Sequence, residues 1–458
     1  MLSLVAVVAL PLVASSAYGE GADANAPEVA SPKRPVPSYD GREPPPTPAS
    51  EVLLGVPRFL LAPPYLINEY LLRRPLAVVV PAAEKAELTR KAYDFFLFAP
   101  DHKGGIVPIV DLELEFYPSA GIYAFWNDAG FKGNDLSLQA QGWADDVFGG
   151  TVMQRIKLGE DRTLQFRLSE THRPDRLFYG IGPSSLGGNE SRYGEQKLDG
   201  SVAHEWRFWR SSRIETMIGV RDVLVYDGHF TSHPSLTEAV ALGRYPLPFG
   251  YEREYTAEYN RIIAAIDTRV PEARRGSGVR LELDGEQGSD VRNTPESGWI
   301  RYGATAAGYV DLNGLRRVLS LSVTAQFVDP LSSSPLPFTE LVYLGGTHAM
   351  EGFYQGRLLG RSAGVATAGY TWPIGPWVDG DLQFAVGNVF GEHLEGFDAR
   401  LLRYSAALGV SIGRLQKTAV MGSQDAPIEV LIGLGSETFQ QGGEIDTVRL
   451  VAGVPMSF

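Results

Sequence analysis

The residues in this sequence that could carry chemistry are a serine-containing loop and two pairs of histidines. Gly182-Pro183-Ser184-Ser185-Leu186-Gly187 places serines between glycines, as a hydrolase nucleophile requires. A nucleophile elbow, however, needs its second glycine one place earlier and a strand that leads directly into a helix. The segment therefore indicates a loop turn.

The histidines are no more specific. His229 and His233 have the spacing of a metal-binding pair, but a following proline and polar neighbours place them in a loop. His172, His204 and Ser184 could act together at the rim of a barrel, although nothing in their spacing favours this. A barrel-embedded hydrolase is a distant alternative. No catalytic residue, cofactor or metal site is predicted.

Composition narrows the class of protein. The 458 residues include no cysteine and carry a formal net charge of −13, which excludes disulfides and argues against a nucleic-acid partner. The mean hydropathy of −0.09 is too polar for a helical membrane protein but suits a barrel, in which half of each strand faces water. Several strand tryptophans are predicted to anchor the chain at a membrane interface: Trp143, Trp206, Trp209 and Trp299.

The first part of the chain has three predicted segments. Residues 1–19 resemble a secretory signal with an apolar run and a small-residue end, although no positive charge precedes Lys33. Residues 20–50 are rich in proline and are predicted to be a disordered leader. Residues 51–97 are predicted to form short helices, which lie either at the periplasmic membrane surface or as a hairpin packed on the barrel.

From about residue 105 onward the apolar residues alternate with polar or small ones, which is typical of strands with one oily face. An even number of such segments suits a closed antiparallel bacterial barrel. The fold class predicted for 98–458 is therefore an all-β transmembrane barrel, preceded by the short helical segment. Its sixteen predicted strands are 106–117, 120–130, 134–144, 150–158, 162–170, 195–209, 212–226, 256–269, 277–286, 297–310, 315–329, 363–373, 376–389, 401–414, 426–438 and 446–458.

The last strand ends on an aromatic residue, as the sorting signals of Gram-negative outer-membrane proteins do. The residues predicted to face outward are Val448, Leu450, Ala452, Val454, Met456 and Phe458. The last three of these form the C-terminal signal. A soluble sheet's last strand is the alternative for this segment alone. A transmembrane barrel is favoured because its oily face turns toward lipid.

The lengths of the connections supply a second test. Outer-membrane barrels have short periplasmic turns and long outer loops. The long connections, 171–194, 227–255 and 330–362, all take the alternate positions expected of outer loops. One inner connection, near 415–425, is longer than this rule expects.

Residues 336–374 resemble the sixth outer loop of the BamA/TamA superfamily of outer-membrane proteins, also called bacterial surface antigens. The motif that carries the resemblance follows Leu344-Gly345-Gly346 and consists of Met350, Glu351, Gly352, Phe353 and Arg357. Further similar patterns are Phe178–Gly182 in the third outer loop and Asp267 and Arg269 in the eighth strand. The resemblance implies a barrel of sixteen strands whose sixth loop folds into the lumen.

Two departures from the family pattern are expected to matter. The segment before the barrel has no room for a POTRA domain of about 75 residues, so the chain resembles a POTRA-less member. Glu351 stands where the family has an arginine. In the family, this arginine pairs with an aspartate of the thirteenth-strand motif. The motif here is Phe384, Ala385 and Gly387, and Ala385 stands in place of the aspartate. Losing one partner alone would leave a buried charge unpaired, at a cost of roughly 3–5 kcal/mol. Losing both leaves no unpaired charge and is therefore tolerable. The nearest cations in sequence for Glu351 are Arg357 and Arg361.

Three functions follow as hypotheses. The resemblance implies an outer-membrane barrel that assists insertion or translocation of other outer-membrane proteins through a seam between residues 106–117 and 447–458. Its partners would be outer-membrane lipid, nascent outer-membrane proteins and periplasmic factors. Gly453 and Pro455 weaken the last strand and favour a labile seam. The alternatives are a passive pore or structural barrel without translocation activity, and the distant alternative of a hydrolase.

Overall fold

Period-two alternation produces the strands of the structure, and β12 (Val318–Pro330) is representative. Its odd-numbered side chains, such as Leu321 and Val323, point outward and are exposed, whereas the polar side chains between them are partly buried. This is the pattern of a sheet with an apolar outer face and a polar inner face. One side of each strand therefore suits lipid, and the other suits a lumen.

The computed structural model describes residues 95–98, 103–251, 253–269, 276–293, 297–312, 314, 316–374, 378–412 and 428–453. The chain divides into two units, Met1–Phe95 and Phe96–Phe458, and the barrel lies in the second. The predicted signal, leader and all but the last residues of the 51–97 segment lie outside the described residues. The C-terminal signal residues Val454, Met456 and Phe458 lie outside them too.

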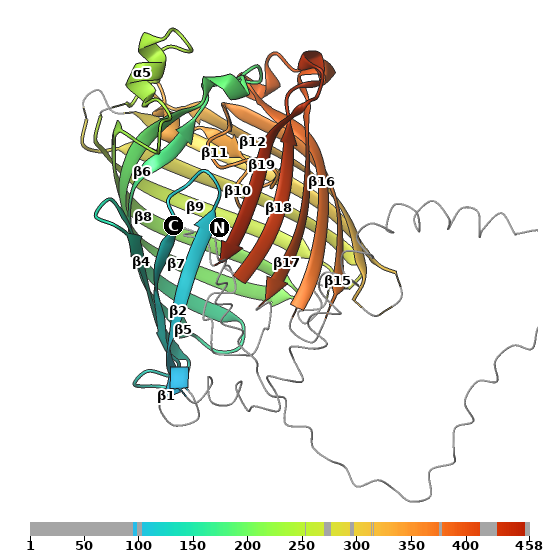
Figure 1. The fold of residues 1–458 in the computed structure, drawn as a ribbon. Helices are drawn as coiled ribbons and strands as arrows, with labels where there is room; N and C mark the ends of the chain where they lie inside the picture. The colour runs from blue at the N-terminus through green and yellow to red at the C-terminus, as the bar shows by residue number, and fades with distance from the viewer. Residues whose placement is uncertain are drawn as a thin grey trace, which may run out of the picture. The chain divides into compact units, whose positions relative to one another are not determined.

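Sixteen strands form the wall of the barrel, as predicted. They are β2 (Gly104–Glu113), β3 (Ser119–Trp126), β4 (Asn134–Trp143), β5 (Val147–Lys157), β6 (Arg162–Phe178), β7 (Ser191–Trp209), β8 (Ser212–Asp227), β9 (Tyr255–Asp267), β10 (Gly278–Asp290), β11 (Gly298–Asp311), β12, β15 (Ser362–Pro373), β16 (Val378–Phe390), β17 (Arg403–Ile412), β18 (Ile428–Ser436) and β19 (Ile445–Gly453). Every strand pairs antiparallel with its neighbours, and β19 pairs with β2, so the sheet closes on itself (Figure 1). This confirms the predicted fold class.

The remaining described elements are short. They are β1 (Leu97–Phe98), β13 (Val342–Leu344), β14 (Leu358–Gly360), α5 (Leu236–Ala241) and the 3₁₀ turns η3 (Gly187–Asn189), η4 (Phe338–Glu340), η5 (Glu392–Leu394), η6 (Ala399–Leu401) and η7 (Phe439–Gln441). None of the described helices has the length and apolar character needed to cross a membrane.

The long connections gather at one end of the barrel. Loop three (179–190), loop four (228–254) and loop six (331–361) lie at the upper end in Figure 1, where α5 is drawn. Turns as short as 210–211 join strands at the other end. The alternation of short and long connections therefore agrees with the prediction, whereas the connection near 415–425 lies outside the described residues.

The predicted boundary of loop three was wrong by several residues on each side. Residues 171–194 were predicted to be a loop, but β6 continues to Phe178 and β7 begins at Ser191. The ladder between them tolerates Pro174 through an irregularity between Arg173 and Arg176. A bulge lets a proline enter a strand because it leaves an unpaired position in the ladder.

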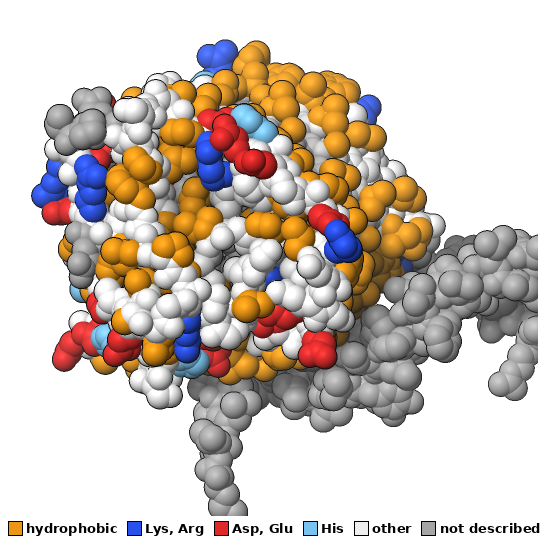
Figure 2. Space-filling model, turned by 90° about the horizontal axis from the view of Figure 1, so that it is seen from above, with side chains coloured by type: hydrophobic (Ala, Val, Ile, Leu, Met, Phe, Trp, Pro, Cys, Tyr) orange, Lys and Arg blue, Asp and Glu red, His pale blue; other side chains and the backbone are white. Residues whose placement is uncertain are grey.

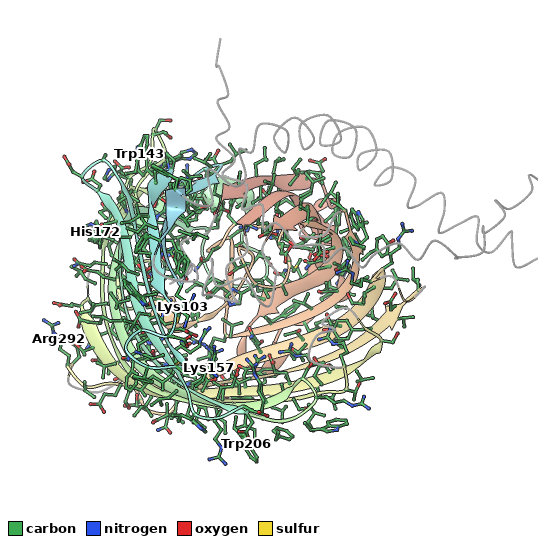
Figure 3. All side chains as sticks on the ribbon, turned by 90° about the horizontal axis from the view of Figure 1, so that it is seen from below. Lys103, Trp143, Lys157, His172, Trp206 and Arg292 are labelled. Atoms are coloured by element: carbon green, nitrogen blue, oxygen red, sulfur yellow. The ribbon has the colours of Figure 1, made fainter. Side chains whose placement is uncertain are left out.

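The outer face of the wall is apolar. Trp143 and Trp206 lie on the outside of the wall in Figure 3, and Trp209 is also half exposed. The prediction that Trp299 anchors the chain at a membrane interface is wrong. Its side chain is fully buried and packs edge-on against Tyr255 in the core of the barrel.

The largest hydrophobic cluster lies inside the barrel, not between two sheets. It joins inward side chains such as Val225 and Val389 to loop-six residues such as Met350 and Phe353. Seen from above, side chains of the described residues fill the mouth of the barrel (Figure 2). The core of this protein therefore depends on what loop six places inside the wall.

The apolar outer face generates a stability prediction. Val323 occupies the middle of the outward row of β12, whereas Leu312 lies in the turn that precedes this strand. We expect Val323→Arg to destabilise the barrel in bilayers by about 2–4 kcal/mol, and the matched control Leu312→Arg by about 0–1 kcal/mol. Equilibrium unfolding from lipid vesicles measures both, and equal effects would show that β12 does not face lipid at its centre.

Candidate functional site

Loop six runs between β12 and β15, the eleventh and twelfth strands of the barrel, and returns through the small hairpin β13–β14. Gly345 and Gly346 have φ of +96° and +65°, a conformation that glycine adopts without strain. They lead into the tip that carries the predicted motif. Within this tip Met350 and Phe353 are completely buried.

The first anchor of loop six is Glu340, in η4. Its carboxylate lies 3.3 Å from Arg221 of β8 and 3.1 Å from Arg301 of β11, and Tyr255 of β9 donates a hydrogen bond of 2.7 Å to it. Burial opposes the charge on Glu340, but the guanidinium groups of Arg221 and Arg301 hold its pKa below the usual range. A buried carboxylate is stable only with such partners, so this contact ties the loop to three strands.

The second anchor is a backbone approach to the opposite part of the wall. The Gly352 amide donates to Ser405 Oγ of β17 at 2.8 Å. A Cβ at position 352 would lie 2.1 Å from the carbonyl oxygen of Leu434, so no larger residue fits. Gly433 of β18 faces this glycine, and a Cβ there would approach Gly352 Cα to 2.7 Å. Two glycines therefore allow loop and strand to touch.

The third anchor is Arg357, which is fully buried. Its guanidinium lies 2.8 Å from Asp446 of β19 and 3.3 Å from Glu437 in the loop before that strand. It also donates to Ser185 Oγ of loop three at 3.0 Å. Loop three therefore lies against loop six and the top of β19. Ser185, the neighbour of the candidate nucleophile Ser184, thus binds this arginine.

The thirteenth-strand motif lies beside the loop tip. In β16, Phe384 is exposed on the outer face, Ala385 is completely buried and Gly387 meets the backbone of β15. Ala385 pairs with Ser405, the residue that holds the Gly352 amide. Ser405 thus contacts the loop-six tip and pairs with the thirteenth strand, although no family-type ion pair can form with alanine.

The two arginines that were predicted as partners of Glu351 form ion pairs with other carboxylates. Arg357 binds Glu437 and Asp446, and Arg361 binds Asp329 at 3.3 Å and Glu392 at 2.9 Å. The partner of Glu351 stays a prediction.

The eighth-strand motif forms a separate local pair. Asp267 and Arg269 lie 2.7 Å apart, and the Arg269 guanidinium stacks 3.7 Å above the ring of Tyr309. Both side chains lie at the end of β9 that leads to the turn toward β10, away from the loops. The structure therefore does not bring this pair to the loop-six tip.

The seam joins β19 to β2. Its described pairs are Val451 with Glu113, Ala452 with Leu112 and Gly453 with Asp111. The Leu114 amide extends this ladder by donating to the Leu450 carbonyl at 3.0 Å. The two strands of the seam are thus joined in regular antiparallel register.

Arg449 of β19 is the functional residue that sequence reasoning did not identify. On the lumen side of the seam, its Nε donates to Glu113 of β2 at 2.6 Å. Its Nη1 donates to the carbonyl oxygens of Gly346 and Glu351 at 2.9 and 3.0 Å. The only signal was a long cation on the otherwise small or polar face of the last strand. One side chain thus touches both strands of the seam and loop six.

The candidate hydrolase residues do not form a triad. His172 pairs with Gln196 in the ladder between β6 and β7, and His204 pairs with Leu164, far along the same ladder. His172 packs on Tyr226. This geometry supports neither a proton relay nor a nucleophile between these histidines.

The two loop histidines also have different partners. His229 lies 3.5 Å from Asp146, while His233 lies 3.1 Å from Glu190 and 3.5 Å from Glu115. The fully buried Arg192 lies 2.6 Å from Glu190 and 3.3 Å from Glu115, so it pairs with both carboxylates. The group is therefore an ion-pair cluster that ties loop three to the first hairpin.

Glu340 generates a pH prediction. Because its pKa is lowered by folding, its stabilising effect is present above the usual carboxyl pKa and is lost as pH falls through the lowered value. A spin label at Gln355→Cys should stay immobile at every pH above the usual carboxyl pKa of about 4.3 and become mobile as pH falls through the lowered pKa of Glu340. Glu340→Gln should loosen the loop already at neutral pH. The exposed control Glu444→Gln should not, and identical behaviour of the two variants would contradict this anchor.

Comparison with known proteins supports the fold. No family model matches the sequence, and no curated protein is similar to it. BamA from Haemophilus ducreyi lacking POTRA domains 1–3 superposes with a TM-score of 0.51 at 13% identity, over 77% of this chain and 70% of that chain. CdiB from Acinetobacter baumannii matches with a TM-score of 0.47, 10% identity and 77% and 59% coverage. CdiB from Escherichia coli gives 0.48, 11%, 78% and 64%.

The chain thus spans less than two thirds of either CdiB chain. At these identities the likeness to BamA concerns the fold alone. It agrees with the sixteen strands of the closed sheet. In its fold this chain is a transmembrane β-barrel of the BamA type.

Proposed function

We propose that this protein is an integral barrel of the Gram-negative outer membrane that assists insertion or translocation of other outer-membrane proteins. The apolar outer face and the likeness of the fold to BamA support the location. The observation that carries the function is the seam, where β19 meets β2 beside an inserted loop six and Arg449 contacts both Glu113 of β2 and the loop.

The mechanism that we propose is lateral opening. Separating β19 from β2 exposes a row of backbone donors and acceptors, to which an incoming strand can add by hydrogen bonding. Loop six contacts both sides of the barrel, so it can hold the wall in shape while the seam separates.

The substrates in this proposal are nascent outer-membrane proteins, delivered by periplasmic factors that capture them before insertion. A passive pore is the other function of a barrel. The packing of loop six in the mouth disfavours it, because Met350 and Phe353 occupy space that a permanent channel needs. The enzymatic alternative gains no support from the separated positions of His172 and His204.

A disulfide across the seam tests the lateral mechanism. Leu114 and Leu450 are joined by a backbone hydrogen bond, and the chain has no native cysteine, so Leu114→Cys with Leu450→Cys gives a single crosslink. We expect the oxidised variant to keep its fold and lose insertion of a reporter barrel into liposomes, and reduction should restore insertion.

The matched control is Leu283→Cys with Ala304→Cys, a facing pair between β10 and β11 far along the sheet from the seam. Oxidising this pair should leave insertion unchanged. Full activity of the crosslinked seam would rule out lateral opening. Absence of insertion even in the unmodified protein would favour the passive barrel.

The altered family pair generates a second test. We propose that positions 351 and 385 are near neighbours, because Ser405 links the Gly352 amide to the strand position paired with Ala385. Glu351→Arg alone should make loop six more sensitive to proteases, and adding Ala385→Asp should restore its resistance. We expect a coupling energy above roughly 0.5 kcal/mol in the double-mutant cycle. Additive effects would mean that the two positions do not touch.

A further inference from the structure

The upper part of β19 extends beyond the first hairpin of the barrel. The ladder with β2 ends at Leu114 and Leu450, and the chain then turns away through Glu115, which has φ of +67°. Residues 445–449 of β19 therefore have a described strand neighbour only on the β18 side. The free side of this segment is a strand edge near the outer surface (Figure 1).

Loop six covers this edge with a side chain in place of a strand. In an antiparallel sheet, alternate residues of one strand direct their backbone groups to the same neighbour. Leu450 directs its carbonyl toward β2, so Val448 directs its carbonyl to the same side, above the end of β2. The Tyr354 hydroxyl donates to that carbonyl at 2.7 Å. Tyr354 therefore occupies the next position that a pairing strand would take.

The ring of Tyr354 is fixed by the first hairpin. It packs edge-on against Phe116, with ring centroids 5.7 Å apart, and is almost fully buried. Phe116 belongs to the turn that follows β2, whereas Val448 belongs to β19. A single loop-six side chain thus bridges the two sides of the seam above its last backbone bond.

Arg449 makes a second bridge of the same kind just below. It joins Glu113 of β2 to the carbonyls of Gly346 and Glu351 in loop six, and its side chain is only 6% exposed. Separation of β2 from β19 removes its carboxylate partner, and withdrawal of loop six removes its two carbonyls. A buried guanidinium that loses partners is costly, so each movement affects the other.

We propose that Tyr354 and Arg449 form a latch through which loop six holds the outer half of the seam closed and occupies the strand edge at Val448. The latch rests on the proposed function, since it regulates the same seam. An extended segment of a client can pair at Val448 only after the Tyr354 hydroxyl leaves. Tyr354 and Arg449 are positioning residues in this scheme.

Hydrogen–deuterium exchange at the Leu114 amide tests the latch directly. The full chain in lipid vesicles is compared with Tyr354→Phe, which keeps the ring on Phe116 and removes only the hydroxyl. Loss of one buried hydrogen bond should raise exchange at Leu114 by about tenfold. Arg449→Gln should also raise it. The double variant Glu113→Gln/Arg449→Gln avoids the unpaired carboxylate that Arg449→Gln leaves, so it separates loss of the latch from loss of the fold.

Two matched controls lie in the same region of the chain. Tyr343→Phe changes another loop-six tyrosine, which is partly buried and whose ring packs on His348. Arg361→Gln removes an arginine that binds Asp329 and Glu392. Neither control should change exchange at Leu114.

Reporter insertion measured in the same vesicles separates this proposal from the proposed function. Faster exchange in Tyr354→Phe supports the latch, whether or not the unmodified protein inserts the reporter. Unchanged exchange in Tyr354→Phe and in the Glu113→Gln/Arg449→Gln variant overturns the latch even if insertion is normal. Equal acceleration in the controls also overturns it, because the effect would then reflect general loosening of loop six.

Discussion

The closure of one sheet on itself is the constraint on which the rest of this structure depends. In hydrocarbon no water can satisfy backbone donors and acceptors, so a sheet can span the layer only if its first and last strands pair. Here that pairing joins β19 to β2. Side chains on the lumen side add to the backbone pairing, above all through the contact of Arg449 with Glu113.

The lumen is organised around loop six in the same way that a soluble protein is organised around its core. Glu340 binds the wall at β8 and β11, while Gly352 touches it at β17 and β18. These anchors differ in chemistry. The carboxylate needs paired cations in a partly dry environment, whereas the glycine needs only the absence of side chains on both surfaces. Together they hold a long loop without a disulfide, since the chain has no cysteine.

The sequence was sufficient to predict the fold because the wall repeats a local signal. Outward residues of β12 and β19 alternate with inward ones, and a barrel converts that alternation directly into strands and their number. The same local signal failed at Pro174, because a bulge in the ladder accommodates a residue that normally ends a strand. Trp299 was assigned to the wrong environment since strand membership alone does not tell the inner face from the outer one.

The candidate site was less predictable. The motif at Gly352 and Phe353 could be placed in loop six through its resemblance, but its contacts depend on residues far away in sequence. Arg449 lies nearly one hundred residues from Glu351 and touches only its backbone oxygen, so no side-chain motif records the contact. Glu340 and Arg221 are likewise distant and belong to no recognisable pattern. Pairings of this kind depend on tertiary placement and not on local sequence.

Arg449 has a thermodynamic consequence for any ligand that binds loop six. Because one guanidinium binds both the loop and the neighbouring strand, the free energy that couples them acts equally in both directions. Any molecule that grips loop six in its inserted position must therefore also tighten the seam, without touching either strand. Conversely, a polypeptide seated between the strands weakens the hold on the loop. An antibody against loop six would thus act as an allosteric ligand of the junction between β19 and β2.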